Sequence, residues 1–310
     1  MPPAHIFIGR HSERVDHKNP EFAKTYSRPH DSPITQAGVV LAEKLGEYLV
    51  DHYHVDPAEV VIITSPLLRC VQTSNGIVVG ALRAAAASAT VSTIPVYLEP
   101  AIMEGSHWMF FDMRNNPSVV EPNDGAFHCP EPVYNDAAFH RASTSPHVQL
   151  ENPFPLHPAP IFRVEDNKLV DSSFPGRCAQ GAKKLLTVSA LDGKTVVLVA
   201  HGETVMHALH AMKGSNTVSE MDSPAYTGFV HITCKISGGR DAGSRRVRTL
   251  RDTSPPHGAE GGVAPHEKRK VLVPTQAFSR SRARFLPTNE QVPAAVVMKR
   301  GCYHPISRRM

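Results

Sequence analysis

The chain has 310 residues, a net charge of +4 and no apolar run that approaches the ~18 to 20 residues of a membrane span. This length can bury one sizeable α/β core, and the N-terminus lacks a basic segment followed by a long apolar run, so we expect a cytoplasmic protein. Five widely spaced cysteines without a C-x-x-C pair, and 18 scattered histidines without metal-ligand spacing, predict reduced thiols, no bound metal and no cofactor.

The chain begins with a strand pattern and a helix pattern separated by a polar loop. Residues 5–9 are a short apolar strand candidate, and the loop runs from about residue 10 to residue 33. Thr35 stands at the N-cap position of a helix predicted over residues 36–51, where its hydroxyl can accept from a first-turn N–H. Apolar residues recur there at steps of three and four, so one face should pack on a sheet.

The alternation of strands and helices continues. Residues 60–64 and 94–98 predict strands, and residues 67–87 predict a helix between them. Roughly residues 105–175 lack periodicity and are rich in Pro, Asn, His and Ser, which indicates an irregular insertion or lid. Residues 179–191 predict a helix, and residues 195–200 predict the most apolar strand of the chain.

Strands that alternate with helices favour parallel pairing through right-handed crossovers, with helices on both faces of the sheet. The predicted fold is therefore a three-layer α/β/α arrangement around a mostly parallel central sheet. Active sites in such sheets collect at the carboxyl ends of the strands. His11, Arg69 and His201 each follow a predicted strand, so we expect them to lie at one edge.

The charge is unevenly distributed along the chain. From Lys235 to the end, 16 Lys and Arg residues stand against 5 Asp and Glu, which leaves a net charge of −7 for residues 1–234. We expect residues 1–234 to form the folded domain and residues 235–310 to form a basic, mostly disordered tail. Such a tail could contact nucleic acid or acidic membrane surfaces, but a solvated extension is the favoured interpretation.

Transfer of a phosphoryl group without a metal needs a nucleophile, fixed cations around the phosphate oxygens and an acid for the leaving oxygen. His11 could attack through one ring nitrogen while the other donates to a backbone carbonyl that fixes the tautomer. Arginine presents a planar fork of donors that suits phosphate oxygens. The cations available near the predicted strand ends are Arg10, Arg14 and Arg69, with His201 as a further donor.

Four segments resemble the histidine phosphatase superfamily, which has the phosphoglycerate mutase-like fold. They are Arg-His-Ser-Glu-Arg at 10–14, Ser-Pro-Leu-Leu-Arg at 65–69, a glutamate at 104 and Ala-His-Gly at 200–202. The longer strings around the first two are similar to the branch of the suppressor-of-T-cell-receptor-signalling and ecdysteroid-phosphate phosphatases, and the segment from Pro224 to Phe229 fits its final strand region. The resemblance spans about residues 5–234.

The resemblance implies a phosphatase that forms a phosphohistidine intermediate on His11. It implies a phosphate pocket of Arg10, His11, Arg14, Arg69 and His201, and Glu104 as the proton donor. Glu99 and Asp112 lie close enough in sequence to compete for the donor role. Ser12 departs from the family, where glycine usually follows the nucleophile. Cys70 lacks the Cys-x5-Arg loop of thiol phosphatases, so we expect it to pack in the core.

The sequence therefore predicts a metal-independent phosphomonoesterase, a hydrolase acting on a phosphorylated small molecule or a phosphoprotein. A catalytically weakened phosphate-ester or phosphoprotein binding module is the alternative, and a phosphomutase is a second one. The similar phosphatases often pair, so a homodimer is compatible with the resemblance. Substrate choice should depend on residues 105–175, whose pattern is the least regular.

Overall fold

The computed structural model describes residues 2–86, 90–141, 143–152, 154, 156, 158–213, 223–235, 246–250 and 284–286. The described helices are α1 Val15–Lys18, α2 Pro20–Thr25, α3 Gln36–Tyr53, α4 Leu68–Ala84, α5 Ser106–Met113, α6 Ala137–Arg141, α7 Gly176–Lys184 and α8 Gly202–Lys213. Short 3-10 turns lie at Pro29–Asp31, Pro57–Glu59, Pro100–Ile102 and Ser189–Leu191. None of the helices in these ranges is long and apolar enough to cross a membrane.

The central sheet is mostly parallel, as the alternation of elements predicts. Its strands run in the order β10-β8-β1-β7-β2-β3-β4, and β9 also pairs with β8. The five strands β1, β7, β2, β3 and β4 are parallel to one another. Strand β8 is antiparallel to each of its partners, β1, β9 and β10. The bounds are β1 His5–Arg10, β2 Val60–Thr64, β3 Ile94–Leu98, β4 Val148–Glu151, β7 Thr195–Ala200, β8 Phe229–Lys235, β9 Arg246–Leu250 and β10 Arg284–Leu286.

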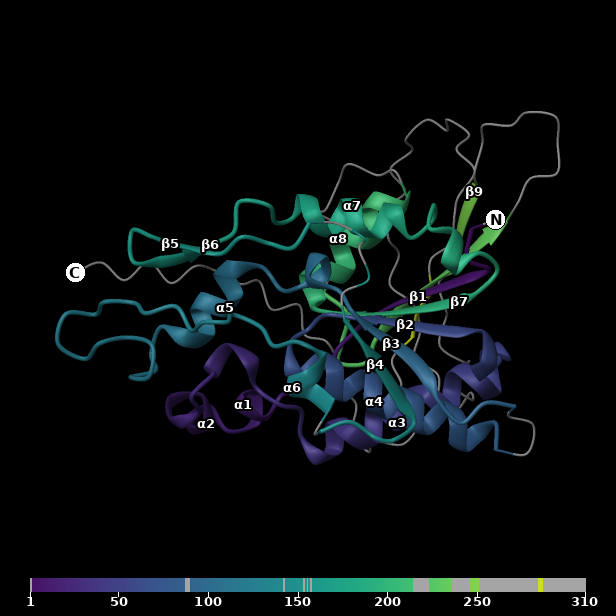
Figure 1. The fold of residues 1–310 in the computed structure, drawn as a ribbon, viewed down its shortest axis with the longest axis horizontal. Coiled ribbons are helices and arrows are strands. Elements are labelled where there is room, and N and C mark those ends of the chain that lie inside the picture. The colour runs from purple at the N-terminus through teal and green to yellow at the C-terminus, as the bar shows by residue number, and fades with distance from the viewer. Residues whose placement is uncertain are drawn as a thin grey trace, which may run out of the picture.

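Helices cover both faces of the sheet, with α7 and α8 on one side and α3 and α4 on the other (Figure 1). Because successive side chains of a strand point to opposite faces, Ile6 and Ile8 of β1 join the core under α7 and α8, while Phe7 joins the core over α3 and α4. Strands buried on both faces read as continuous apolar runs. The three-layer α/β/α fold is confirmed.

Glycine explains how α3 and α4 pack closely over the sheet. A Cβ on Gly46 of α3 would lie 2.1 Å from the Ile77 carbonyl oxygen, and a Cβ on Gly80 of α4 would lie 1.9 Å from the Glu43 carbonyl oxygen. Only residues without a Cβ allow the two backbones to approach this closely. Gly80 therefore does not interrupt the predicted helix but serves its packing against α3.

The structure corrects the prediction for the polar loop after β1, and in the segment 105–175, where short helical pieces were expected, it adds strands that were not predicted. The polar loop after β1 contains the short helices α1 and α2. The segment 105–175 contains α5 and α6, the hairpin of β5 Arg163–Glu165 and β6 Lys168–Val170, and strand β4, which extends the parallel sheet beside β3. At four residues, β4 is too short for its periodicity to stand out in a Pro-rich region.

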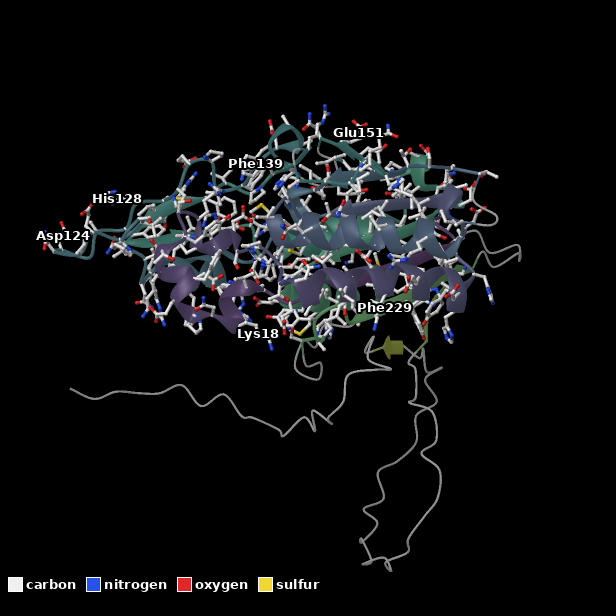
Figure 2. The ribbon with its side chains drawn as sticks, turned by 90° about the horizontal axis from the view of Figure 1, so that it is seen from below. Lys18, Asp124, His128, Phe139, Glu151 and Phe229 are labelled. Atoms are coloured by element: carbon white, nitrogen blue, oxygen red, sulfur yellow. The ribbon has the colours of Figure 1, made fainter. Side chains whose placement is uncertain are left out.

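Part of the segment between α5 and α6 projects from the sheet, and Figure 2 shows Asp124 and His128 at its far end. The turn of the β5–β6 hairpin contacts it through Asn167, whose side chain accepts from Phe127 N at 2.5 Å and donates to Gly125 O at 2.6 Å. Two loops of the 105–175 segment are thus joined.

Within the predicted basic tail, the structure describes only the strands β9 and β10, both paired with β8. These two strands were not predicted. The rest of residues 236–310 lies outside the described residues, and so does the prediction of disorder made for it.

Candidate active site

The strand ends bring the predicted site residues together. Strand β1 pairs with β7, and β7 pairs with β2, so the loops that follow these three neighbours meet at one edge of the sheet. The rings of His11 and His201 lie 5.3 Å apart between centroids, and both are buried. The pKa values of His11, Glu104 and His201 are all shifted by nearby arginines of the predicted set. The six predicted residues Arg10, His11, Arg14, Arg69, Glu104 and His201 therefore lie close together.

His11 is held as a neutral imidazole with one ring nitrogen facing away from the backbone. Its Nδ1 donates to the Ser12 carbonyl oxygen at 2.8 Å, which leaves a lone pair on Nε2. Burial, followed by the positive charge of Arg69, holds the pKa of His11 well below its usual value. The carbonyl contact that the sequence predicted is present, and the imidazole is unprotonated at neutral pH.

Arg69 and Arg10 both keep a buried donor that no described residue accepts. Arg69, fully buried, donates from Nη1 to the His30 carbonyl oxygen at 2.8 Å and from Nη2 to the Glu104 carboxylate. Arg10 donates from Nη1 to Pro224 O at 3.0 Å. The Nε atoms of Arg10 and Arg69 have no partner among the described residues. Because unpaired buried donors are costly, they fit an anionic ligand.

Arg14 is held by two carboxylates: Asp16, which the sequence offered either as a partner of Arg14 or as a surface ion pair, and Asp112, whose contact with Arg14 was not predicted. Its Nε donates to Asp16 Oδ1 at 2.9 Å, and its Nη2 donates to Asp112 Oδ2 at 2.8 Å. Burial lowers the Arg14 pKa, but Asp112 and Asp16 outweigh it, so the pKa lies above its usual value. Arg14 is thus a fixed cation of the pocket, oriented from α1 and from α5.

Glu104, the predicted proton donor, is a carboxylate in this structure. It pairs with Arg69, and its Oε2 lies 3.6 Å from His201 Nδ1. Burial raises its pKa, but the charges of Arg69 and Arg14 outweigh burial and leave the pKa below its usual value. An acid role therefore depends on a change of charge in the pocket, which a bound phosphate dianion supplies by repulsion.

Glu99 and Asp112, the two alternatives to Glu104 as proton donor, lie in different environments. Glu99 accepts from the backbone N–H groups of Ala101 at 2.8 Å and Leu156 at 3.0 Å, so its carboxylate is committed to the backbone. Asp112 remains in the pocket. Burial, together with the like charge of Glu104, raises the Asp112 pKa to about 6 against the opposing effect of Arg14. Asp112 is therefore mostly ionised at pH 7 and takes up its proton near pH 6.

Ser12 has the space that a residue larger than glycine requires. Its hydroxyl donates to the Gly38 carbonyl oxygen at 2.7 Å, and its N–H donates to Thr73 Oγ1 at 2.9 Å. A Cβ on Gly38 would lie only 3.1 Å from Ser12 Oγ and 2.9 Å from Glu13 O. Gly38, at the start of α3, thus accommodates the serine without displacing the loop.

His201 is oriented by a residue that the motif contains but that was not assigned a role. Its Nε2 lies 2.9 Å from Ser65 Oγ. The Glu104 carboxylate near Nδ1 favours the tautomer with hydrogen on Nδ1, in which the Ser65 hydroxyl donates to Nε2. Cys70 packs in the core as predicted, and burial raises the pKa of its thiol to about 12.

Tyr226 is a further neighbour of the pocket. The Arg10 guanidinium lies 4.5 Å from the centre of its ring, and the ring lies 5.7 Å from that of His11. The sequence offers only a weak signal for it, because it reaches the site from the loop before β8, which pairs antiparallel with β1. Stacking fixes the Arg10 guanidinium beside His11.

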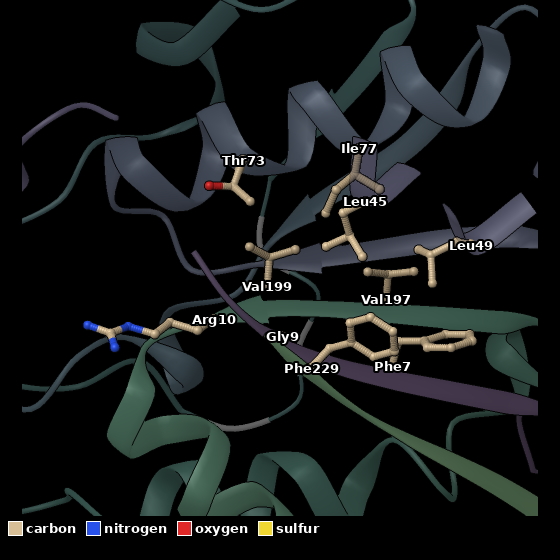
Figure 3. Close-up of a pocket in the computed structure, with 10 residues that line it drawn as sticks. All are labelled: Phe7, Gly9, Arg10, Leu45, Leu49, Thr73, Ile77, Val197, Val199 and Phe229. Atoms are coloured by element: carbon tan, nitrogen blue, oxygen red, sulfur yellow. The ribbon is translucent and has the colours of Figure 1, made fainter. Parts of the chain in front are cut away.

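A small apolar cavity lies beneath this site rather than in it (Figure 3). Its lining comes from β1, β7 and β8 on one side and from α3 and α4 on the other, and Leu49 and Arg10 mark its opposite ends. The Arg10 guanidinium points away from the cavity. Within the ranges that the structure describes, no group of three or more His, Cys, Asp or Glu side chains could hold a metal ion.

Histidines and arginines at the carboxyl ends of parallel strands define an α/β protein with an anion-binding site. The family described as the histidine phosphatase superfamily (branch 1) matches residues 6–99. This part of the chain, 94 of its 310 residues, is similar to that superfamily. The match contains His11 and the three arginines, whereas Glu104 and His201 lie beyond it.

The chain is similar to several solved structures. The ecdysone phosphate phosphatase from Bombix mori, in complex with tungstate, has a TM-score of 0.51 and 16% identity, covering 85% of this chain and 97% of that chain. A phosphoserine phosphatase mutant from Entamoeba histolytica, in complex with phosphoserine, has a TM-score of 0.39 and 15% identity, covering 78% and 94%. No curated protein is significantly similar in sequence. The first comparison shows the phosphoglycerate mutase-like fold.

Proposed function

We propose that the protein is a metal-independent phosphomonoesterase that forms a phosphohistidine on His11. The observation that carries this proposal is the state of His11: buried, neutral and anchored through Nδ1, beside two arginines with unpaired buried donors. A neutral imidazole with a fixed tautomer can attack phosphorus, whereas a protonated one cannot.

The first half of the reaction transfers the phosphoryl group to the enzyme. The phosphate of the substrate binds among the arginines, and His11 Nε2 attacks phosphorus as the bond to the leaving oxygen breaks. Glu104 gives that oxygen a proton, so the alcohol or phenol departs neutral. The negative charge of the bound phosphate repels the Glu104 carboxylate and favours its protonated form.

The second half returns the enzyme to its starting state. Ionised Glu104 accepts a proton from a water molecule, and the water oxygen attacks phosphorus as the bond to His11 Nε2 breaks. Inorganic phosphate leaves and His11 is again neutral. Arg10, Arg14 and Arg69, with Nδ1–H of His201, stabilise the equatorial oxygens in both halves because their donors are already fixed in place.

The experiment is hydrolysis of p-nitrophenyl phosphate by the wild-type protein and by His11→Ala, each with and without a chelator. We expect the wild type to turn over in chelator and the variant to lose at least about 10³-fold in kcat/KM, the scale of removing a nucleophile. Thermal melting checks that the variant is folded. Retained turnover by folded His11→Ala would refute the assignment of His11 as the nucleophile. Loss of wild-type activity in chelator would refute the proposal that the reaction needs no metal.

The same protein sample discriminates the two other candidate functions. Brief reaction with ³²P-labelled substrate and acid-free quenching should trap an acid-labile label on His11. Saturable binding without label would indicate a phosphate-ester or phosphoprotein binding module. Transfer of the label to an added alcohol in preference to water would indicate a phosphomutase. We rank these below the phosphatase because residues 6–99 resemble the histidine phosphatase superfamily.

We also propose that residues 1–234 form the phosphatase domain, to which β9 and β10 add two edge strands. Residues 105–175 contribute Asp112 to the pocket and the exposed aromatic side chains of Trp108 and Phe111 next to it on α5. This placement supports a role of the segment in choosing among phosphorylated substrates.

A further inference from the structure

Arg177 is a buried arginine whose donors go almost entirely to one stretch of backbone. It lies in the first turn of α7, only 1% exposed. Its Nη1 donates to the carbonyl oxygens of Ala101 at 2.7 Å and Met103 at 3.0 Å, and its Nη2 donates to that of Glu104 at 3.1 Å. The guanidinium thus binds the backbone of Glu104 and of the residues that lead to it.

The charge of Arg177 is balanced by a second buried residue, Asp171. Its Oδ2 accepts from Arg177 Nε at 2.9 Å, and both side chains are completely buried. Asp171 N–H also donates to Ser106 Oγ, in the first residue of α5, at 3.1 Å. The pair therefore holds both sides of Glu104, the turn that precedes it and the helix that follows it.

The backbone that Arg177 binds lies between two elements, and among its carbonyl groups that of Met103 also accepts from Thr204 Oγ1 at 3.4 Å. The 3-10 turn Pro100–Ile102 ends before Met103, and α5 begins at Ser106, so Glu104 lies between two elements and in neither. Carbonyl groups in such a linker need partners when they are buried. A planar fork with several donors can bind three of them at once, whereas a lysine ammonium cannot reach them with the same geometry.

The Glu104 side chain is fixed from the opposite direction. Its carboxylate pairs with Arg69, which is itself fixed by the His30 carbonyl oxygen. Two buried arginines thus hold Glu104, one at the carboxylate and one at the main chain. On phosphate binding the first contact must compete with the substrate, whereas the Arg177 contacts involve no phosphate-binding donor.

We propose that Arg177, held by Asp171, is a positioning residue that keeps Glu104 at the leaving oxygen while Arg69 turns to the substrate. The proposal rests on the acid role assigned to Glu104 above. Its consequence is specific: loss of Arg177 impairs protonation of the leaving group more than binding of the phosphate. A displacement of about 1 Å at a reacting group can cost on the order of 100-fold in rate.

The test compares leaving groups. We would measure kcat/KM of the wild type, Arg177→Lys and Glu104→Gln with p-nitrophenyl phosphate, phenyl phosphate and an alkyl phosphate. A good leaving group needs little help from an acid, and an alkoxide needs the most. We expect Arg177→Lys to lose at least about tenfold more activity on the alkyl phosphate than on p-nitrophenyl phosphate. A loss equal for all three substrates would overturn the proposal.

Two further variants separate positioning from stability. Leu49→Ala removes a buried side chain from the core over α3 and α4, away from Glu104, and should lower the melting temperature without changing the dependence on leaving group. Asp171→Asn keeps the shape of the counter-residue but removes its charge. If Arg177→Lys does not fold, Asp171→Asn decides: it should show the same leaving-group dependence, and a uniform loss would overturn the proposal.

A double variant tests whether Arg177 acts through Glu104. With Glu104→Gln already present, Arg177→Lys should change kcat/KM for the alkyl phosphate by less than about threefold, because no acid remains to position. A full additional loss would overturn the proposal. Failure of the proposed function gives a different result, because folded His11→Ala would then keep its activity on p-nitrophenyl phosphate. Substitution of Arg177 should affect turnover of that substrate least, so the two failures can be told apart.

Discussion

Asp112 offers a quantitative test of the charges in the pocket, through the stability of the protein and not through its activity. Its folded pKa is about 6, because burial and the charge of Glu104 raise it from 3.8. A group whose pKa is raised on folding binds its proton more tightly in the folded state. The folded state is therefore penalised once pH rises above 3.8, and the penalty is complete above pH 6.

The size of this penalty follows from the shift of about two pKa units. Each unit corresponds to about 1.4 kcal/mol, so the ionised Asp112 lowers the free energy of unfolding by at most about 3 kcal/mol. Between pH 4 and pH 7.5, where most of the titration takes place, the change is about 2 kcal/mol. Asp112→Asn removes the titrating group, so the variant gains this amount relative to the wild type as pH rises.

The assay is urea unfolding of the wild type and Asp112→Asn at pH 4 and at pH 7.5, followed by circular dichroism. At one pH, the difference in the free energy of unfolding between the two proteins includes a contribution from the new amide, which does not change with pH. The change of this difference between pH 4 and pH 7.5 therefore measures the effect of ionising the Asp112 carboxyl group. Asp16 still binds Arg14 in the variant. A difference that stays constant from pH 4 to 7.5, or that favours the wild type at the higher pH, would refute the reasoning.

Three further predictions concern His11 and the loop that carries it. Because burial, followed by Arg69, holds the His11 pKa well below 6.5, a pH profile of kcat/KM corrected for substrate ionisation should show no loss centred near pH 6.5, and such a loss would mean an exposed imidazole. Ser12→Gly should lower the free energy of unfolding by about 1 kcal/mol, the net value of its hydroxyl bond to Gly38, and change kcat/KM only a few-fold. Gly38→Ala places a methyl 2.9 Å from the Glu13 carbonyl oxygen and should lower kcat/KM at least about tenfold by moving this loop, and unchanged steady-state kinetics would contradict the packing argument.

Elements with a strong physical signature could be predicted from the sequence. The predicted ranges 60–64, 94–98 and 195–200 coincide with β2, β3 and β7, because fully or largely buried strands demand short apolar runs. Thr35 caps α3 by accepting from Gly38 N, as its position before a periodic segment predicts. The helix predicted over residues 179–191 was less accurate: α7 begins three residues earlier, and the end is a separate 3-10 turn.

In the candidate site, too, some residues could be predicted from the sequence and others could not. Residues at strand ends were predicted to converge because parallel neighbours share an edge, and His11, Arg69 and His201 do so. Asp112 was predicted only as a competitor of Glu104 for the donor role, and Arg177 was not predicted as part of the site. Both come from segments without a fixed sequence distance to the strands, and the contacts of Arg177 are with carbonyl oxygens, which every residue has. Such contacts leave no signature in a single sequence.

The charges of the pocket residues indicate how binding and proton transfer are coupled in the proposed mechanism. Three arginines face three carboxylates there, so the site is compensated by Asp16, Asp112 and Glu104 before any phosphate arrives. A phosphate dianion that takes the Arg69 donors removes the charge that keeps Glu104 ionised and adds a repelling one. In the proposed mechanism, Glu104 then takes up a proton at the moment when the leaving oxygen needs one. A strongly cationic pocket would bind phosphate more tightly, but it would hold its acid in the wrong protonation state, so the compensating carboxylates favour turnover over retention.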